Sequence, residues 1–278
     1  PKWPLTAAQQ EIRLAHELDE TGVRSIVGGY VHIHGRIDAD LFERAVRIVV
    51  AGSETLRVRI DGNTQIVEEL PDWPLERDRF RTVAEAERWL YAELHNPFDL
   101  GTAPLFEQRL LDVGEAGYLW FVKAHHIVLD GASFIALLRR VAGVYTELSA
   151  GREVVSEVFD RVETLVAQDN HYRESERFAA DRKFWSDRLA DMPEAPMFAE
   201  GPGRSGPTAY LRHTGDLAAS DWRDLRELGE RWEVGWPALV LSAAAILLHA
   251  DTGARTVALG LAVPAKRSRT ALGMTANV

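Results

Sequence analysis

Residues 118–127 constrain the fold more than any other segment of this chain. They include four consecutive large apolar residues, at positions 119–122, in a stretch that favours a strand. Because successive side chains of a strand point to opposite faces, such a strand exposes apolar groups unless both faces are covered. We therefore expect it in the middle of a sheet that is packed on both sides.

Segments with strand-like and helix-like patterns alternate along the 278 residues. Apolar residues recur at helical spacing after Asp38 and again over residues 132–149, where they form one stripe. Thr82 and Glu85 form a capping-box pattern at the start of another helix. Further strands are predicted over residues 26–36, 56–60, 65–70, 105–113, 209–215 and 256–263, and the turn residues Asp61-Gly62-Asn63 join the second and third of these in a hairpin. Further helices are predicted over 161–189 (two), 220–231 and 237–248, and the last is expected to bury its apolar residues 239–248. This alternation predicts a layered α/β fold.

Composition excludes several classes of protein. The chain has no cysteine, which excludes disulfides, cysteine-ligated metals and a cysteine nucleophile, and which fits a reducing, cytoplasmic location. The net charge is -10 and the one basic run, residues 266–269, is short, so we expect no nucleic-acid partner. The longest apolar run, residues 243–248, is too short to cross a membrane. Residues 191–207 hold four prolines and three glycines and are the best linker candidate.

The segment most informative about function begins at the C-terminal end of the buried strand. His125 and His126 are adjacent there, and Asp130 and Gly131 come just before the amphipathic helix. Adjacent strand side chains point to opposite faces, so the two histidines are poorly placed to chelate one ion, and we predict no metal site. Imidazole exchanges protons near neutral pH, and α/β sites usually form where strands end. A lone core histidine is usually structural. A pattern with four fixed residues, His-His-x-x-x-Asp-Gly, is a more specific sign of a functional site.

The residues around the helix start have expected roles of their own. A buried carboxylate at Asp130 needs a partner, and an arginine is the best candidate. Gly131 is expected to let the backbone turn closely, and the helix start offers N–H groups to a developing oxyanion. Ser133 is a candidate either to cap the helix or to touch substrate.

The spacing His-His-x-x-x-Asp-Gly matches the signature of the condensation-domain superfamily of acyltransferases, which includes enzymes similar to chloramphenicol acetyltransferase. The chain resembles, in particular, the condensation domains of non-ribosomal peptide synthetases. Four further stretches resemble motifs of that branch, namely residues 4–10, 53–58, 96–105 and 260–277. The motif residues to which the resemblance assigns the catalytic centre are His125, His126, Asp130 and Gly131.

The resemblance implies a fold and a set of partners. The fold would be a two-layer α/β sandwich, with a lobe like chloramphenicol acetyltransferase over residues 1–176 and an incomplete C-terminal lobe over 177–278. A tunnel would separate the lobes, and the phosphopantetheine arms of donor and acceptor carrier proteins would enter it from opposite sides. No other cofactor is implied. The chain would be a monomeric module beside other synthetase domains.

The resemblance also implies a reaction. The acceptor amine would attack the donor thioester near His126 and form an amide. Asp130 would form a structural salt bridge with Arg267, and Asn277 would lie near the tunnel or serve in a turn. A free amine has a pKa of about 8, so we favour positioning of the amine and stabilisation of the tetrahedral intermediate as the role of His126. A role as general base is the alternative.

Some features depart from the family pattern. Arg13 stands where many relatives have an aromatic residue, and Ala51 and Gly52 replace a common Arg-His pair, which leaves the donor subtype open. The sequence ends at Val278, inside the last motif, so we expect the chain to be part of a longer polypeptide.

Two kinds of alternative function remain open. An ester-forming acyltransferase or an epimerase of the superfamily would use the same histidine. A degenerate domain that only binds carriers is the other alternative, although such domains usually lose the second histidine or the glycine, and both are present here.

Overall fold

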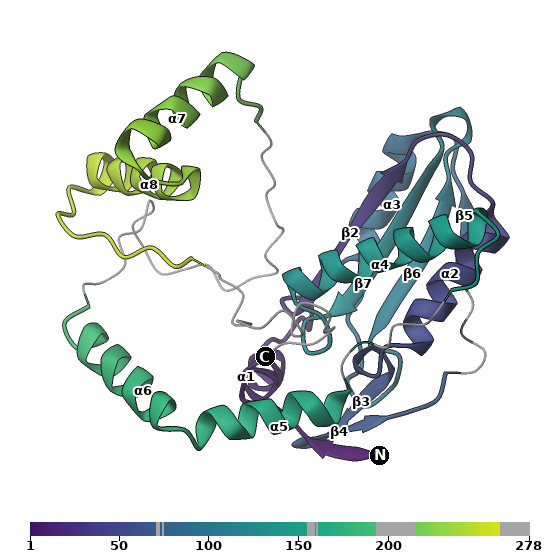
Figure 1. Ribbon diagram of the computed structural model, residues 1–278, viewed down its shortest axis with the longest axis horizontal. Coiled ribbons are helices and arrows are strands. Elements are labelled where there is room, and N and C mark those ends of the chain that lie inside the picture. The colour runs from purple at the N-terminus through teal and green to yellow at the C-terminus, as the bar shows by residue number, and fades with distance from the viewer. Residues whose placement is uncertain (71–72, 74, 155–158, 160, 193–214, 262–278) are drawn as a thin grey trace. The chain divides into compact units, whose positions relative to one another are not determined.

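The computed structural model describes residues 1–70, 73, 75–154, 159, 161–192 and 215–261 (Figure 1). Its residues fall into two compact units, Pro1–Phe178 and Ala179–Val263, as far as the described residues reach. The predicted linker at 191–207 and the predicted strand at 209–215 lie almost wholly outside the described residues.

Unit 1 is built on a four-stranded sheet. Its strands are, in spatial order, β2 (Ile26–Ile33), β7 (Tyr118–His125), β6 (Phe106–Asp112) and β5 (Glu76–Arg79). All neighbours are antiparallel except β5 and β6, which are parallel. The strand predicted to be covered on both faces, β7, lies inside the sheet and is buried from its second residue onward.

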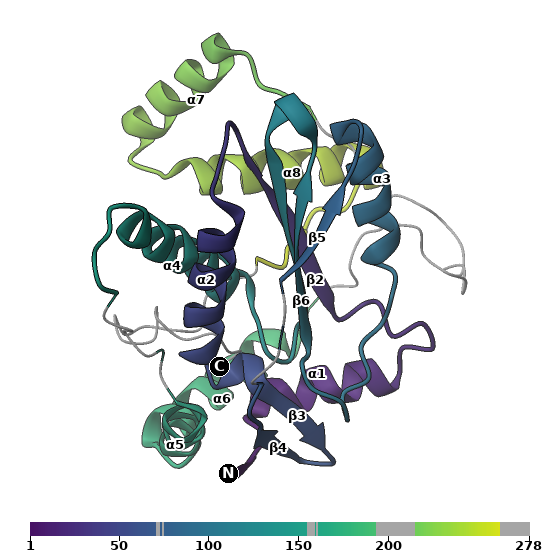
Figure 2. The ribbon, with the colours of Figure 1, turned by 90° about the vertical axis from the view of Figure 1, so that its right-hand side faces the viewer.

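Helices lie on both faces of this sheet (Figure 2). On one face are α2 (Ala39–Ala51) and α4 (Gly131–Ser149), which pack against the even-numbered side chains of β7, such as Trp120 and Val122. On the other face is α3 (Val83–Glu93), which packs against the odd-numbered ones, such as Phe121. This alternation of core residues fixes the register of the strand, because a shift of one residue would exchange the faces. The predicted layered α/β architecture is confirmed.

A smaller sheet joins the N-terminus to a hairpin. Its strands are, in spatial order, β1 (Lys2–Pro4), β4 (Thr64–Val67) and β3 (Val58–Asp61), and a short 3-10 turn, Thr55–Arg57, precedes β3. The hairpin was predicted from its turn residues. Gly62 adopts a φ of 57°, a left-handed conformation that glycine reaches without steric cost.

The helix caps follow the sequence signals only in part. Asp38 caps α2 by accepting from two backbone N–H groups. Thr82 accepts from the Glu85 N–H, but the Glu85 carboxylate accepts from the Arg81 N–H at 3.0 Å, so the predicted capping box is only half formed. A complete box, not predicted, lies between Thr6 and Gln9 and starts α1 (Ala7–Glu17).

The C-terminal part of the described chain is helical. α5 (Val162–Arg173) belongs to unit 1, α6 (Glu176–Leu189) crosses the boundary between the units, and α7 (Ala219–Trp232) and α8 (Trp236–Thr252) belong to unit 2. No single helix in the described ranges is long and apolar enough to cross a membrane. α7 and α8 reach that length and composition only as a pair, with a bend of 102° between them.

Unit 2 differs from the prediction in two respects. Of the apolar residues at 239–248 that were expected to be buried, Leu239 and Leu248 are, but Ile246 and Leu247 are exposed. The strand predicted over 256–263 is absent from its described part, residues 256–261. Both differences have one physical reason. The described residues of unit 2 contain no strand, so no sheet is present there to cover α8 or to pair with the predicted segment.

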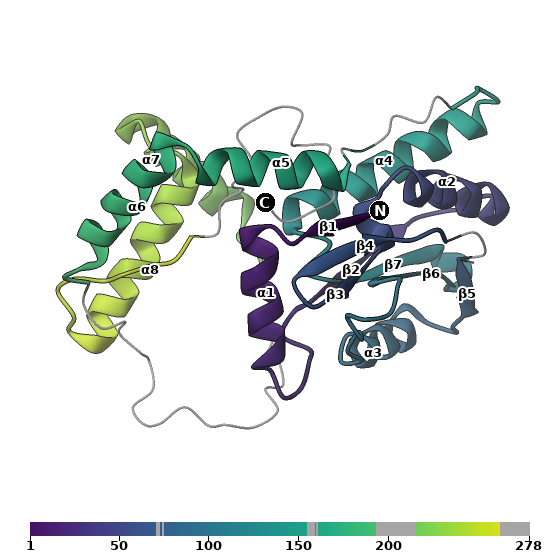
Figure 3. The same cartoon turned by 90° about the horizontal axis from the view of Figure 1, so that it is seen from below.

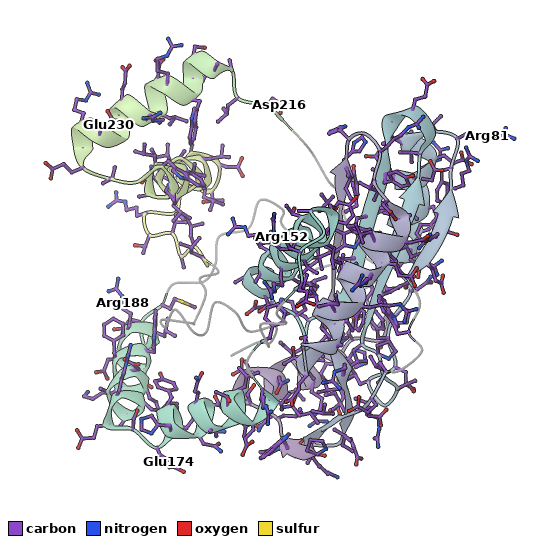
Figure 4. The ribbon with its side chains drawn as sticks, turned by 45° about the vertical axis from the view of Figure 1, so that its right-hand side comes forward. Arg81, Arg152, Glu174, Arg188, Asp216 and Glu230 are labelled. Atoms are coloured by element: carbon purple, nitrogen blue, oxygen red, sulfur yellow. The ribbon has the colours of Figure 1, made fainter. Side chains whose placement is uncertain are left out.

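Figure 4 shows how the packing around the sheet of unit 1 differs from that around α6. Side chains crowd the space between the sheet and the helices of unit 1, whereas those of α6, up to Arg188, stand out around the helix. None of the α6 side chains is buried.

Candidate functional site

The candidate site lies where β7 ends. The segments next to β6 and β2 accept hydrogen bonds from the main-chain N–H groups of the two histidines. The His125 N–H donates to the Leu105 carbonyl at 2.9 Å, and the His126 N–H donates to the Ser25 carbonyl at 2.7 Å. These bonds extend the pairing of β7 with β6 and β2 by one residue on each side, so the backbone of the motif is part of the sheet framework.

The two imidazoles differ in exposure. His125 is fully buried, on the face of β7 that carries Phe121 and Lys123. His126 is only partly buried. His125 is therefore enclosed in the protein, whereas His126, at the end of a central strand, is partly exposed to solvent.

Both ring nitrogens of His125 are hydrogen-bonded. Its Nδ1 accepts from the Ile127 N–H at 3.1 Å, and its Nε2 lies 3.2 Å from Nδ1 of His16 in α1. Because Nδ1 is an acceptor, the hydrogen-bond network assigns the single proton of a neutral His125 to Nε2, which then donates to His16. Burial, followed by the nearby charges of His16 and His126, lowers the pKa of His125 to about 3. His125 therefore stays neutral near pH 7 and is not suited to proton transfer.

Lys123 lies on the same face as His125 and is 2% exposed. Its ammonium group is 2.9 Å from the Glu93 carboxylate and 3.3 Å from that of Glu107. Although burial acts to raise the pKa of Glu93, hydrogen bonds from Asn96 and Lys123 hold it below its ordinary value. The charges on this face are thus paired with one another, as a buried cation requires.

Asp130 is the N-cap of α4. Its carboxylate accepts from the Ser133 N–H at 2.7 Å, and its own carbonyl accepts from the Phe134 N–H. Asp130 and not Ser133 is therefore the N-cap residue, and Ser133, three positions later, donates its N–H to the Asp130 carboxylate. Ser133 itself is buried.

Gly131 is exposed and is the first residue of α4. It has no positive φ, and a Cβ built on it would meet no described atom within 4 Å. The expectation that glycine is needed for a close backbone turn is therefore wrong. An alanine would fit the backbone there.

Gln9 and His16 of α1 were not predicted as site residues. Gln9 is 2% exposed, and its amide Nε2 donates to the Ile127 carbonyl at 3.2 Å and to Gln65 Oε1 at 3.1 Å. Figure 3 shows α1 beside one end of the strands. The pattern Thr6-x-x-Gln9 could have revealed the start of α1, but no local signal indicates its contacts with a loop 118 residues away.

Other predicted site residues cannot be placed. Arg267 and Asn277 lie outside the described residues, and with them the predicted salt bridge to Asp130. In the part of the chain that the structure describes, no three His, Asp or Glu side chains gather as metal ligands would.

Comparison with known proteins identifies this arrangement. The family model of the condensation domain matches residues 2–275. The chain belongs to the condensation-domain family. The resemblance inferred from the motifs is thereby confirmed.

Two curated relatives show the context in which such chains occur. The condensation-domain chain is 33% identical over 285 residues to a dimodular nonribosomal peptide synthase of Bacillus subtilis (strain 168), covering 100% of this chain and 12% of the relative. It is 35% identical over 271 residues to an isonitrile lipopeptide synthase of Streptomyces coeruleorubidus, covering 94% of this chain and 18% of the relative. The chain thus spans less than a fifth of either relative.

Solved structures agree with the fold. The first condensation domain of the calcium-dependent antibiotic synthetase, in complex with a substrate analogue, superposes with a TM-score of 0.88 at 28% identity, covering 100% of this chain and 68% of that one. The starter condensation domain of rhizomide synthetase, in complex with C8-CoA and Leu-SNAC, gives 0.86 at 29% identity, covering 99% and 64%.

Proposed function

We propose that the chain forms an amide between a donor acyl thioester and an acceptor amine, each carried on the phosphopantetheine arm of a carrier protein. The observation that carries this proposal is the partly exposed His126 imidazole at the end of β7, inside the family's histidine motif. The sealed and neutral His125 beside it leaves His126 as the imidazole of the motif that can meet a substrate.

The proposed reaction requires few steps, and His126 takes part in them directly. The amine nitrogen attacks the thioester carbonyl, the C–S bond breaks, and the amine proton leaves with the thiolate or through His126. The ring of His126 orients the amine and stabilises the charge of the tetrahedral intermediate. The Ser133 N–H, one of the donors at the start of α4, is bonded to Asp130, so it does not serve an oxyanion.

The product of the reaction tests this proposal. The full-length protein is mixed with a carrier loaded with an acyl donor and a carrier loaded with an aminoacyl acceptor, and the acceptor carrier is analysed by mass spectrometry. We expect an acyl-aminoacyl thioester joined through an amide. An ester product, an inverted stereocentre without chain growth, or carrier binding without any product would each replace the amide proposal with one of the alternatives.

Several finer points belong to the same proposal. Residues 1–176 would form the N-terminal lobe and 177–278 part of a second one. The partners would be neighbouring synthetase domains and two carrier proteins. The protein would act in the cytoplasm and without a bound cofactor. Asp130 would pair with Arg267. A double-mutant cycle of Asp130→Ala and Arg267→Ala should then show a coupling free energy of about 1 kcal/mol or more, and additive effects would exclude the pairing.

A further inference from the structure

One face of α1 points toward the motif loop. Gln9 and His16 are seven residues apart, which is two turns of helix, so their side chains leave α1 on the same side. Both reach the segment that contains His126, Gln9 directly and His16 through His125.

The amide of Gln9 has a fixed orientation. Its Oε1 accepts from the Thr6 N–H at 3.0 Å and from Gln65 Nε2 at 2.9 Å, while its Nε2 donates to Gln65 and to the Ile127 carbonyl. A flipped amide would set donor against donor at Thr6 and acceptor against acceptor at Ile127. Gln9 and Gln65 are both buried, so water does not compete for these hydrogen bonds.

His16 lies two helical turns after Gln9 in α1 and contacts His125, which precedes His126. Its Nδ1 faces Nε2 of His125, and the two rings meet edge to face with their centroids 5.0 Å apart. His125 in turn accepts from the Ile127 N–H. The orientation of the His125 ring therefore depends on an acceptor that α1 supplies.

Together these bonds fix the backbone on both sides of His126. The peptide before its Cα is held by the Ser25 carbonyl, and the peptide after it is held by Nδ1 of His125. The next carbonyl, that of Ile127, is held by Gln9. The direction of the His126 side chain follows from the two backbone dihedral angles that these contacts restrain.

We propose that Gln9 and His16 are positioning residues that aim the His126 imidazole at the reacting thioester. This inference rests on the proposed function of His126. Gln9 is too deeply buried to contact a carrier-bound substrate, so it acts through the loop and not by binding. A misplacement of about 1 Å can lower a rate by about 100-fold, and we expect the loss to appear in kcat and not in KM.

The first experiment changes Gln9 in the full-length protein and measures condensation between loaded donor and acceptor carriers. Gln9→Ala should lower kcat by about 10- to 100-fold, with the KM for the acceptor carrier unchanged within about twofold. Gln10→Ala is the matched control, since Gln10 is exposed, lies next to Gln9 in α1, and its side-chain amide donates to the Leu5 carbonyl within the same local segment. Its kcat should equal that of the wild type.

The second experiment asks whether an acceptor is what His16 supplies. His16→Leu removes the acceptor for His125 Nε2–H and should lower kcat by about 10-fold. His16→Asn places an amide oxygen near the position of Nδ1 and should restore kcat to within about threefold. A role in packing alone predicts the opposite order, because leucine fills more of the apolar volume than asparagine.

The outcomes separate the inference from the proposed function. If folded Gln9→Ala and His16→Leu proteins turn over like the wild type while His126→Ala does not, the positioning role is wrong and the function of His126 stands. If His126→Ala is fully active, the function itself fails. Nitrogen-15 NMR of the wild-type histidines does not depend on the variants folding. It should show His125 as the neutral Nε2–H tautomer, and an Nδ1–H tautomer would overturn the proposed bond to His16.

Discussion

The two sides of the sheet at the end of β7 carry neighbouring histidines in opposite circumstances. On one side, His125 is sealed, neutral and hydrogen-bonded through both nitrogens, next to the paired charges of Lys123 and Glu93. On the other side, His126 is partly exposed, and its main-chain N–H donates to the Ser25 carbonyl of the neighbouring strand segment. The two histidines of one motif therefore have different roles. His125, on the buried side, holds the loop by hydrogen bonds, and His126, on the exposed side, is accessible for the reaction.

The largest effect on stability should come from the charges of the buried side. Lys123→Met removes the cation between Glu93 and Glu107 and leaves two carboxylates without it. The free energy of unfolding, measured by urea denaturation at pH 7, should fall by about 3 kcal/mol or more. Lys2→Met is the matched control, because the pair of Lys2 and Asp61 is exposed on both sides and should contribute little. Equal stability of the two variants would show that the Lys123 network does not hold the site.

The pH dependence of stability should reveal the neutral His125. Its pKa is about 3 in the folded protein and 6.5 in the unfolded chain, so between these values the unfolded state binds more protons and stability falls as the pH is lowered. The slope for this one group approaches about 1.4 kcal/mol per pH unit. His125→Asn cannot take up that proton, so its unfolding free energy should fall less steeply over the same range in urea titrations. Parallel curves for the two proteins would mean that His125 is not held neutral.

The smallest effect is expected at the start of α4. Because Gly131 has no positive φ and open space around its Cα, Gly131→Ala should leave the melting temperature unchanged or raise the stability by about 0.5 kcal/mol. The same variant should lose turnover if substrate approaches the helix start. A marked loss of stability would show that Gly131 stabilises the folded protein. The exposed side of the site would then contribute to stability as the buried side does.

The sequence predicted the parts of this site that depend on local patterns. The apolar run at 119–122 indicated a central strand, and the motif indicated that its end carries the chemistry. The alternation of side chains in a strand also explains why one histidine is buried when the other is not. These inferences needed only residue order and the geometry of a strand.

The remaining features depend on contacts between distant segments. The bond from Gln9 to Ile127 joins residues 118 apart, and that from His125 to His16 joins residues 109 apart. No periodicity encodes such pairs. The strand predicted over 256–263 is absent from its described part, residues 256–261, for a related reason, since an apolar segment becomes a strand only when a partner strand is present. The expected turn at Gly131 was wrong because a glycine by itself does not reveal whether the backbone or an approaching group requires it.

The most direct test is a single-turnover measurement of amide formation by His126→Ala beside the wild type, with both carriers loaded and with thermal unfolding followed for both proteins. The account predicts a rate lower by about 100-fold or more, with a nearly unchanged melting temperature, because this ring is partly exposed and its backbone bonds remain. A wild-type rate from the folded variant would contradict it.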